Sequence, residues 1–151
     1  MGKNRAKKTP KIAKGNQPLG LKSVPTGVSG EGQGHPTPLW RLSSIDWDSP
    51  WCPSKCVDQG IREIHSWMAN LEGMPWVQIL SNGSHVVGTD GIIPEARKRI
   101  IALGKAEWQD HLCSLRKTGK QRLWGFLRAG IFHVLWWDPE HEVYESKKKN
   151  T

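Results

Sequence analysis

The chain has 151 residues, a formal net charge of +8 and 36% hydrophobic residues. This length is sufficient for one domain with a sizeable core. The sequence has no apolar run of about eighteen residues and no apolar segment after its basic N-terminus, which argues against a membrane span and a secretory signal. We therefore expect a cytoplasmic protein with no membrane partner.

The positive charge lies mainly at the two ends of the chain. Residues 1–34 carry seven Lys and Arg side chains and one Glu, whereas residues 35–146 carry twelve basic and thirteen acidic side chains. The composition predicts a disordered basic tail over 1–37, because its frequent Gly and Pro and its lack of aromatic residues cannot support a core. A second basic tail is expected over 147–151. Such tails bind polyanions by neutralising phosphates, or act only as solvated segments.

All nine tryptophans lie between Trp40 and Trp137, so a single folded domain is expected over 38–146. Its first segment, Pro38 to Trp47, alternates apolar and polar residues, which predicts a strand that leads into a turn at 48–50.

The three cysteines do not form a recognisable metal-binding pattern. Cys52 and Cys56 are separated by three residues, and Cys113 is distant. His65 and His85 could in principle complete a zinc site, but lone cysteines are more often small buried side chains. We expect neither a metal nor a cofactor.

Helical periodicity marks the middle of the chain. Residues 57–71 have the pattern of an amphipathic helix, and residues 74–80 that of a short one. The adjacent Ser84 and His85 contain a nucleophile and a base by composition, but they are interpreted as loop residues because neighbours seldom present their side chains to each other. A helix is predicted over 93–104, with Arg97, Lys98 and Arg99 on its solvent face, and another over 107–115.

The segment from Gln121 to Tyr144 organises the rest of the chain. Period-two alternation up to Arg128, a turn at 129–130 and an apolar run over 131–137 predict a β-hairpin that ends at Asp138-Pro139. Val143 and Tyr144 are expected to add a third short strand. The predicted fold is α+β, with N-terminal helices packed on a small antiparallel sheet. One tryptophan of the pair 136–137 should face away from the hairpin core and be covered by another element.

Candidate functional residues concentrate in this region. Five cations surround one predicted turn and strand: Arg116, Lys117, Lys120, Arg122 and Arg128. Exposed Trp124 and Phe126 would offer rings for base stacking. His133, His141 and Tyr144 supply proton donors and acceptors, which RNA cleavage needs beside cations that stabilise the phosphorane charge. Each of the three also has a purely structural interpretation: His133 as a core residue, His141 as a turn residue and Tyr144 as a strand residue.

The segment Leu112 to Tyr144 resembles a group of small bacterial proteins that share a Leu-Arg-x-x-Gly-Lys turn, an Arg-x-Trp-Gly strand and Leu-Trp-Trp-Asp-Pro-x-His. More loosely, helices followed by an arginine-bearing strand and a last strand with His and Tyr are similar to the RelE/ParE toxin superfamily. That resemblance implies an RNA-cleaving toxin, with Arg122, Arg128, His141 and Tyr144 as catalytic groups. It also implies an antitoxin and RNA or the ribosome as partners.

Two functions therefore follow from the sequence. The first is a metal-independent endoribonuclease of the RelE type, with Arg116, Lys117, Lys120, Trp124 and the tail residues Lys147, Lys148 and Lys149 as nucleic-acid contacts. The second is a non-catalytic protein that binds nucleic acid or the ribosome. A small-molecule enzyme is less favoured, because the sequence lacks a phosphate-binding glycine loop and a nucleophile elbow.

Overall fold

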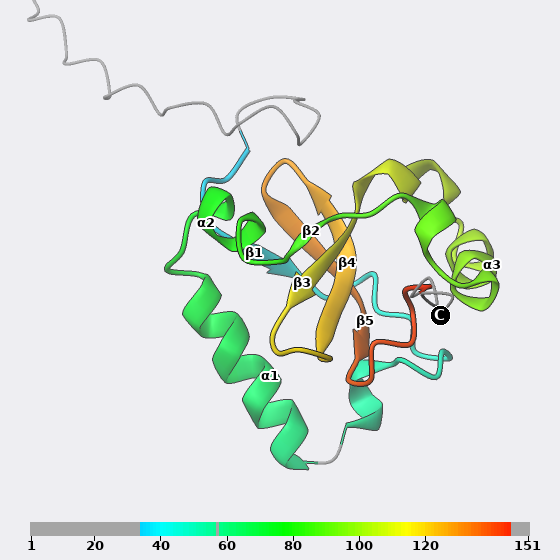
Figure 1. Ribbon diagram of the computed structural model, residues 1–151, viewed down its shortest axis with the longest axis horizontal. Coiled ribbons are helices and arrows are strands. Elements are labelled where there is room, and N and C mark those ends of the chain that lie inside the picture. Colours follow the sequence, from blue (N-terminus) through cyan, green and yellow to red (C-terminus); the bar gives the residue numbers. More distant parts are fainter. Residues whose placement is uncertain (1–33, 57, 146–151) are drawn as a thin grey trace, which may run out of the picture.

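The computed structural model describes residues 34–56 and 58–145. The disordered tail predicted over 1–37 lies almost wholly outside this range, as does the basic C-terminal tail with Lys147, Lys148 and Lys149. A five-stranded sheet with strand order β1-β5-β4-β3-β2 forms the centre of the molecule (Figure 1). The strands are β1 (Leu39–Arg41), β2 (His85–Val86), β3 (Leu112–Arg116), β4 (Arg122–Arg128) and β5 (Ile131–Asp138).

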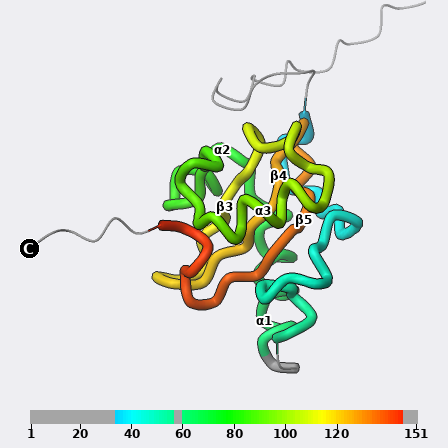
Figure 2. The backbone as a smooth tube through the Cα atoms, turned by 90° about the vertical axis from the view of Figure 1, so that its right-hand side faces the viewer, coloured from blue at the N-terminus to red at the C-terminus, as the bar shows by residue number. Residues whose placement is uncertain are grey.

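The helices cover both faces of this sheet. They are α1 (Asp58–Leu71), α2 (Trp76–Leu80) and α3 (Pro94–Ala102), with 3-10 turns η1 (Pro53–Lys55), η2 (Thr89–Gly91) and η3 (Ala106–His111). Figure 1 shows α1 and α2 on one side of the strands and α3 on the other, and Figure 2 shows α3 in front of the sheet. No helix among the described residues is long and apolar enough to cross a membrane.

The predicted α+β class is confirmed, with the three predicted helices at 57–71, 74–80 and 93–104 close to α1, α2 and α3. The sheet is mixed, however, because β1 runs parallel to β5 while the other neighbours are antiparallel. The strand expected over 38–47 is limited to β1. The third strand expected at Val143 and Tyr144 is reduced to a single bridge between Ile92 and Tyr144.

The helix predicted over 107–115 is wrong. Its first part is the 3-10 turn η3, and its second part is β3, which lies between β2 and β4. Four consecutive residues of β3, from Leu112 to Leu115, are buried. A strand that is covered on both faces carries a continuous run of small and apolar residues, and such a run does not show the alternation that would distinguish it from a helix.

Two hydrophobic clusters lie on opposite faces of the sheet. One combines Ile64 and Met68 of α1 and Trp76 of α2 with strand residues such as Trp137. The other combines Ile100 of α3 with strand residues such as Trp136, and with Trp51, Val87 and Val143 from the loops. Both tryptophans of the pair 136–137 are buried, because each faces a different cluster. The expectation that the outward one would be covered is confirmed.

A β-bulge interrupts the hairpin between β4 and β5. The register shifts between Trp124, which faces Trp136, and Gly125, which faces Val134. Leu135 is therefore the extra residue, and it shares a cluster with Trp136. A Cβ atom on Gly125 would overlap the His133 carbonyl oxygen and the Phe132 ring, so only glycine fits there.

Candidate nucleic-acid interface

The predicted catalytic residues occupy two opposite ends of β4. Arg122 faces Asp138 at one end, and Arg128 faces Ile131 beside the hairpin turn at the other. Seven residues in a strand span roughly 20 Å. The fold therefore brings Arg122 close to residues 138–144 and places Arg128 far from them, so the four predicted catalytic groups do not form one site.

The Arg122 side chain is hydrogen-bonded to the turn that precedes its strand. Its guanidinium donates hydrogen bonds to the Thr118 carbonyl at 2.6 Å, the Gln121 carbonyl at 3.0 Å and the Gly119 carbonyl at 3.2 Å. The side chain is buried, and this burial together with the nearby Arg116 charge lowers its pKa, while Asp138 opposes the shift. Arg122 thus holds the β3–β4 turn together, which leaves fewer donors for a phosphate.

The other cations of this turn also have partners within the domain. Lys117 Nζ lies 3.9 Å from a Glu63 carboxylate oxygen, and Lys120 Nζ lies 3.3 Å from a Glu140 carboxylate oxygen. Arg116 is exposed and donates from Nε to the Thr118 carbonyl at 3.3 Å. The cationic turn expected from the sequence is therefore partly neutralised by acidic side chains that are distant in sequence.

His141 and Tyr144 do come together at the end of β5. Their rings stack with centroids 5.9 Å apart and an interplanar angle of 18°. The loop that carries them is fixed by buried Asp138, whose carboxylate accepts the Glu142 backbone N–H at 2.9 Å and the Val143 backbone N–H at 3.0 Å. Burial and the Arg122 charge lower the pKa of His141, although Asp138 opposes the shift. The imidazole is therefore neutral near pH 7 and able to accept a proton.

Trp124 is not available for base stacking. The prediction that Trp124 and Phe126 are exposed is wrong, because both side chains are fully buried in the cluster under α3. Alternation correctly placed them on one face of the hairpin, but α3 and η3 cover that face. Lys147, Lys148 and Lys149, the predicted tail contacts, lie outside the described residues.

A second cationic group, which the sequence did not indicate, surrounds Trp108 at the Arg128 end of the sheet. We call Arg41, Lys105, Trp108, Arg128 and His133 the Trp108 cluster. Lys105 Nζ lies 3.9 Å from the Trp108 ring centroid, and the Arg128 guanidinium carbon lies 4.4 Å from it. The parallel register places Arg41 of β1 directly beside His133 of β5. Three cations from three separate parts of the chain thus converge.

The pKa of His133 reflects the combined charge of these cations. It is buried, and its ring stands edge-on to Trp108 with centroids 4.8 Å apart. Burial lowers its pKa to about 4, and Arg41, Lys105 and Arg128 each contribute to the shift. The Glu107 carboxylate accepts the Trp108 indole N–H at 3.2 Å. Over residues 34–56 and 58–145, none of the three cations forms an ion pair.

No sequence signal could have identified this group. Arg41, Lys105 and Arg128 are isolated basic residues at positions far apart in the chain. Only the β1–β5 pairing and the position of η3 against β4 bring them together. Counting charges along a segment ignores side chains that are distant in sequence. Such a count therefore selects residues 116–122 as a cationic site and overlooks the Trp108 cluster.

Other predicted residues have structural roles. Arg99, expected on the solvent face of its helix, instead pairs with buried Asp46, to which its Nε donates at 2.8 Å. Ser84 is buried and accepts the Arg116 backbone N–H at 2.9 Å, while His85 is exposed at the start of β2. Within the described ranges, no three His, Cys, Asp or Glu side chains gather as a metal site requires.

Comparison with known proteins gives no identification. No protein-family model, no curated protein and no solved structure matches the chain. Any assignment of function therefore rests on the geometry of its side chains.

Proposed function

We propose that this protein binds single-stranded RNA, with the Trp108 cluster as a principal contact for the phosphate backbone. The observation that carries the proposal is the convergence of Arg41, Lys105 and Arg128 without an ion-pair partner among the described residues. Phosphate neutralisation supplies the sequence-independent part of nucleic-acid affinity. A domain that is close to neutral over 35–146 concentrates cations here.

The cluster is also prearranged for an anion. Lys105 and Arg128 are both positioned over one indole ring, and a cation over an aromatic face gains roughly 0.5–2 kcal/mol. Trp108 is itself supported by an edge-on contact with Phe126, at 5.6 Å between centroids. Holding like charges together in this way is unfavourable without a counter-charge, and a bound phosphate relieves the repulsion. Ordered side chains lose less conformational entropy on binding than free ones.

The salt dependence of RNA affinity tests the proposal. A fluorescein-labelled RNA of twelve nucleotides is titrated with the intact chain at 50 to 200 mM salt, and anisotropy reports the Kd. Each lost phosphate contact reduces the slope of log affinity against log salt by about 0.7. The double change Lys105→Gln with Arg128→Gln should therefore reduce the slope by about 1.4.

The matched control is Arg62→Gln with Lys98→Gln, since both side chains are exposed, neither belongs to the cluster, and the charge change is the same. The control should leave the slope within about half a unit of that of the unaltered chain. If the two double variants reduce affinity and slope equally, general charge rather than the Trp108 cluster carries the binding.

RNA cleavage at the opposite end of β4 is the second candidate function. It is favoured by the stacking of a neutral His141 on Tyr144 beside Arg122. In this scheme His141 accepts the 2′-hydroxyl proton, Tyr144 protonates the leaving oxygen and Arg116 or Arg122 meets the phosphorane charge. This second candidate function includes the proposals of a RelE/ParE-like toxin fold, an antitoxin partner and action on the ribosome. Arg128 and Trp124 do not belong to this site, because one lies at the far end of β4 and the other is buried.

Induced expression in a bacterial host tests this second candidate. The intact chain should arrest growth, and His141→Gln and Tyr144→Phe should each relieve the arrest while circular dichroism shows an unchanged fold. Arg122 is unsuitable as a test residue because its removal would disturb the turn. The exposed His65→Gln serves as the control. An absence of arrest, or an arrest that persists in both variants, would refute the catalytic roles.

A further inference from the structure

The chain enters the described domain beside the Trp108 cluster. The His35 backbone N–H donates to the Ala129 carbonyl at 3.0 Å, and Ala129 directly follows Arg128, a member of the cluster. Gly130 packs so closely against His35 that a Cβ atom on this glycine would overlap the His35 backbone. Figure 2 shows the start of the described chain, in light blue, at the turn between β4 and β5. Residues 1–33 are therefore attached to the domain next to Arg128.

The fold fixes this point of attachment. The Pro36 carbonyl accepts the Trp76 backbone N–H at 3.0 Å, and the Trp76 indole N–H donates to the Gly130 carbonyl at 2.9 Å. Trp76 is buried in the hydrophobic cluster that includes α1 and α2. The position of the attachment point relative to Arg128 is thus set by packing within the domain.

The segment attached at this point is strongly basic. Residues 1–33 carry seven Lys and Arg side chains and one acidic side chain, and six of the seven cations lie within residues 3–14. Lys14 precedes Gly34 by 20 residues, and a chain of that length spans at most roughly 70 Å in any conformation. One group confined to a sphere of that radius has a local concentration of about 1 mM, which is typical of linked binding modules.

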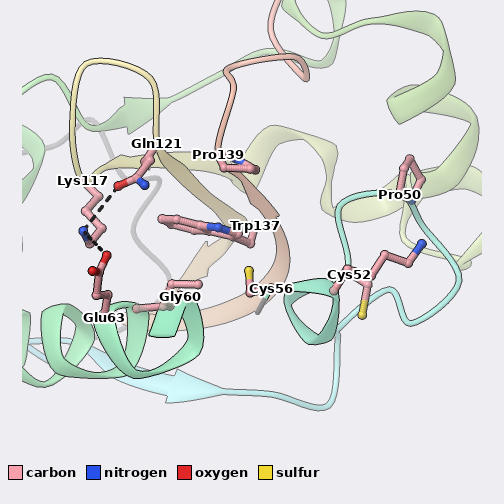
Figure 3. A pocket seen from close by; sticks show the side chains of 11 residues that line it. Pro50, Cys52, Cys56, Gly60, Glu63, Lys117, Gln121, Trp137 and Pro139 are labelled. Atoms are coloured by element: carbon pink, nitrogen blue, oxygen red, sulfur yellow. Dashed lines mark hydrogen bonds and ion pairs between the residues drawn. The ribbon is translucent and has the colours of Figure 1, made fainter. Parts of the chain in front are cut away.

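The cations of the β3–β4 turn are less suited to extend the phosphate contacts of the Trp108 cluster. Lys117 lines a cavity of about 370 Å³ beside Trp137, where its Nζ lies 3.3 Å from Gln121 Oε1 and 3.9 Å from Glu63 Oε2 (Figure 3). Lys120 pairs with a glutamate as well. A phosphate at this turn would meet carboxylates, whereas residues 1–33 offer seven cations for one carboxylate.

We propose that residues 1–33 and the Trp108 cluster bind one RNA strand together, so that the protein selects single strands long enough to contact both. The inference rests on the proposed function and defines its substrate class. Once the cluster holds a strand, contacts with residues 1–33 form within one complex and lose no further translational freedom. A strand of four nucleotides has three internucleotide phosphates, no more than the cluster has cations, and should gain nothing from the segment.

An RNA of twenty-four nucleotides tests the proposal. It carries fluorescein and is titrated with the intact chain at 50 to 200 mM salt, and anisotropy reports the Kd. Lys7→Gln with Lys8→Gln alters the segment, and Lys105→Gln with Arg128→Gln alters the cluster. Each double change should weaken binding about tenfold and reduce the salt slope by about 1.4, and the combination should weaken binding about a hundredfold. Two independent sites cannot give this result, because the unaltered site would still hold the strand.

Two controls separate shared binding from general charge. Arg62→Gln with Lys98→Gln makes the same charge change at exposed positions outside the cluster and should leave the affinity within about twofold. The four-nucleotide strand is followed through the Trp108 indole resonance of the intact chain labelled with ¹⁵N, assigned by its loss in Trp108→Phe. Its affinity should fall in the cluster variant and stay unchanged in the Lys7, Lys8 variant.

The proposal is overturned if the Lys7, Lys8 variant binds the long strand as the Arg62, Lys98 control does, or if it weakens the short strand as much as the long one. A combined loss no larger than the greater single loss would also overturn it. A cluster variant without effect would refute the proposed function and this inference with it. An effect of the cluster variant alone would refute only the inference.

Discussion

Asp46 is the residue whose removal should most clearly destabilise the domain through a defined set of contacts. Its buried carboxylate accepts hydrogen bonds from Arg99 Nε at 2.8 Å, from Arg99 Nη2 and from the Trp136 indole at 3.1 Å. Asp46→Ala removes the acceptor of all three donors. The Arg99 side chain is 31% exposed and can turn to water, whereas Trp136 is fully buried.

The expected loss follows from these two different surroundings. An unpaired indole N–H in the core costs about 1–2 kcal/mol. The ion pair with Arg99 is partly screened, so its loss adds about 1–2 kcal/mol, between the values for exposed and buried pairs. The free energy of unfolding should therefore fall by about 3 kcal/mol, which lowers the Tm of a domain of this size by roughly 10 °C.

Urea unfolding at pH 7, followed by tryptophan fluorescence, measures this loss. Asp48→Ala is the control, because Asp48 is exposed and only two residues away. A difference between the two variants below about 1 kcal/mol would refute the reasoning, since surface substitutions alone account for that much.

The pH dependence supplies an independent check. Burial alone would raise the pKa of Asp46, but the hydrogen bonds from Arg99 and Trp136 and the Arg99 charge outweigh it, so the pKa lies below its usual value. A lowered carboxyl pKa stabilises the fold above the unfolded value of about 3.9, and this contribution is lost as the pH falls through the folded value. The difference between the unaltered chain and Asp46→Ala should therefore shrink in acid. A difference that stays constant down to about pH 2 would contradict an ionic role.

Three further predictions concern the strands. Gly125→Ala should lower the free energy of unfolding, measured in urea, by more than about 3 kcal/mol, because its methyl group overlaps the His133 carbonyl and the Phe132 ring. A near-neutral effect would show that the backbone at the bulge can move to accommodate a methyl group. The imidazole of His133, with its pKa lowered to about 4, should stay neutral in NMR titrations to near that pH, and stability should fall between about pH 6.5 and 4 because only the unfolded chain takes up the proton; a midpoint near 6.5 would contradict this. Cys113, whose pKa burial raises to about 12, should resist iodoacetamide at pH 8 until the chain unfolds, as mass spectrometry would show; alkylation of the native protein would refute this.

The sequence predicted the local elements well where hydrophobic periodicity agrees with the Pro and Gly residues that begin or end an element. Pro94 begins α3, and Gly104, with a positive φ of 67°, follows its end. The hairpin turn at 129–130 also falls where the small residues predicted it, with positive φ values at both positions. In these cases the backbone conformation is set by residues that adjoin each other, so a local pattern is sufficient.

The sequence could not predict which faces are covered or which charges meet. Alternation placed Trp124 and Phe126 together on one face, but only the packing of α3 and η3 against that face makes it interior. The cations of the β3–β4 turn are partly neutralised by Glu63 and Glu140, which come from other parts of the chain.

Composition and periodicity by themselves determined the α+β class, the approximate positions of α1, α2 and α3, and the C-terminal hairpin, because these depend on side-chain spacing along one segment. Tertiary structure alone decided the parallel pairing of β1 with β5, the convergence of Arg41, Lys105 and Arg128, and the cavity beside Trp137. Each of these joins segments that are distant in the sequence. Electrostatic and packing energies depend on distance in space, and spacing along the chain does not specify that distance once the chain has folded.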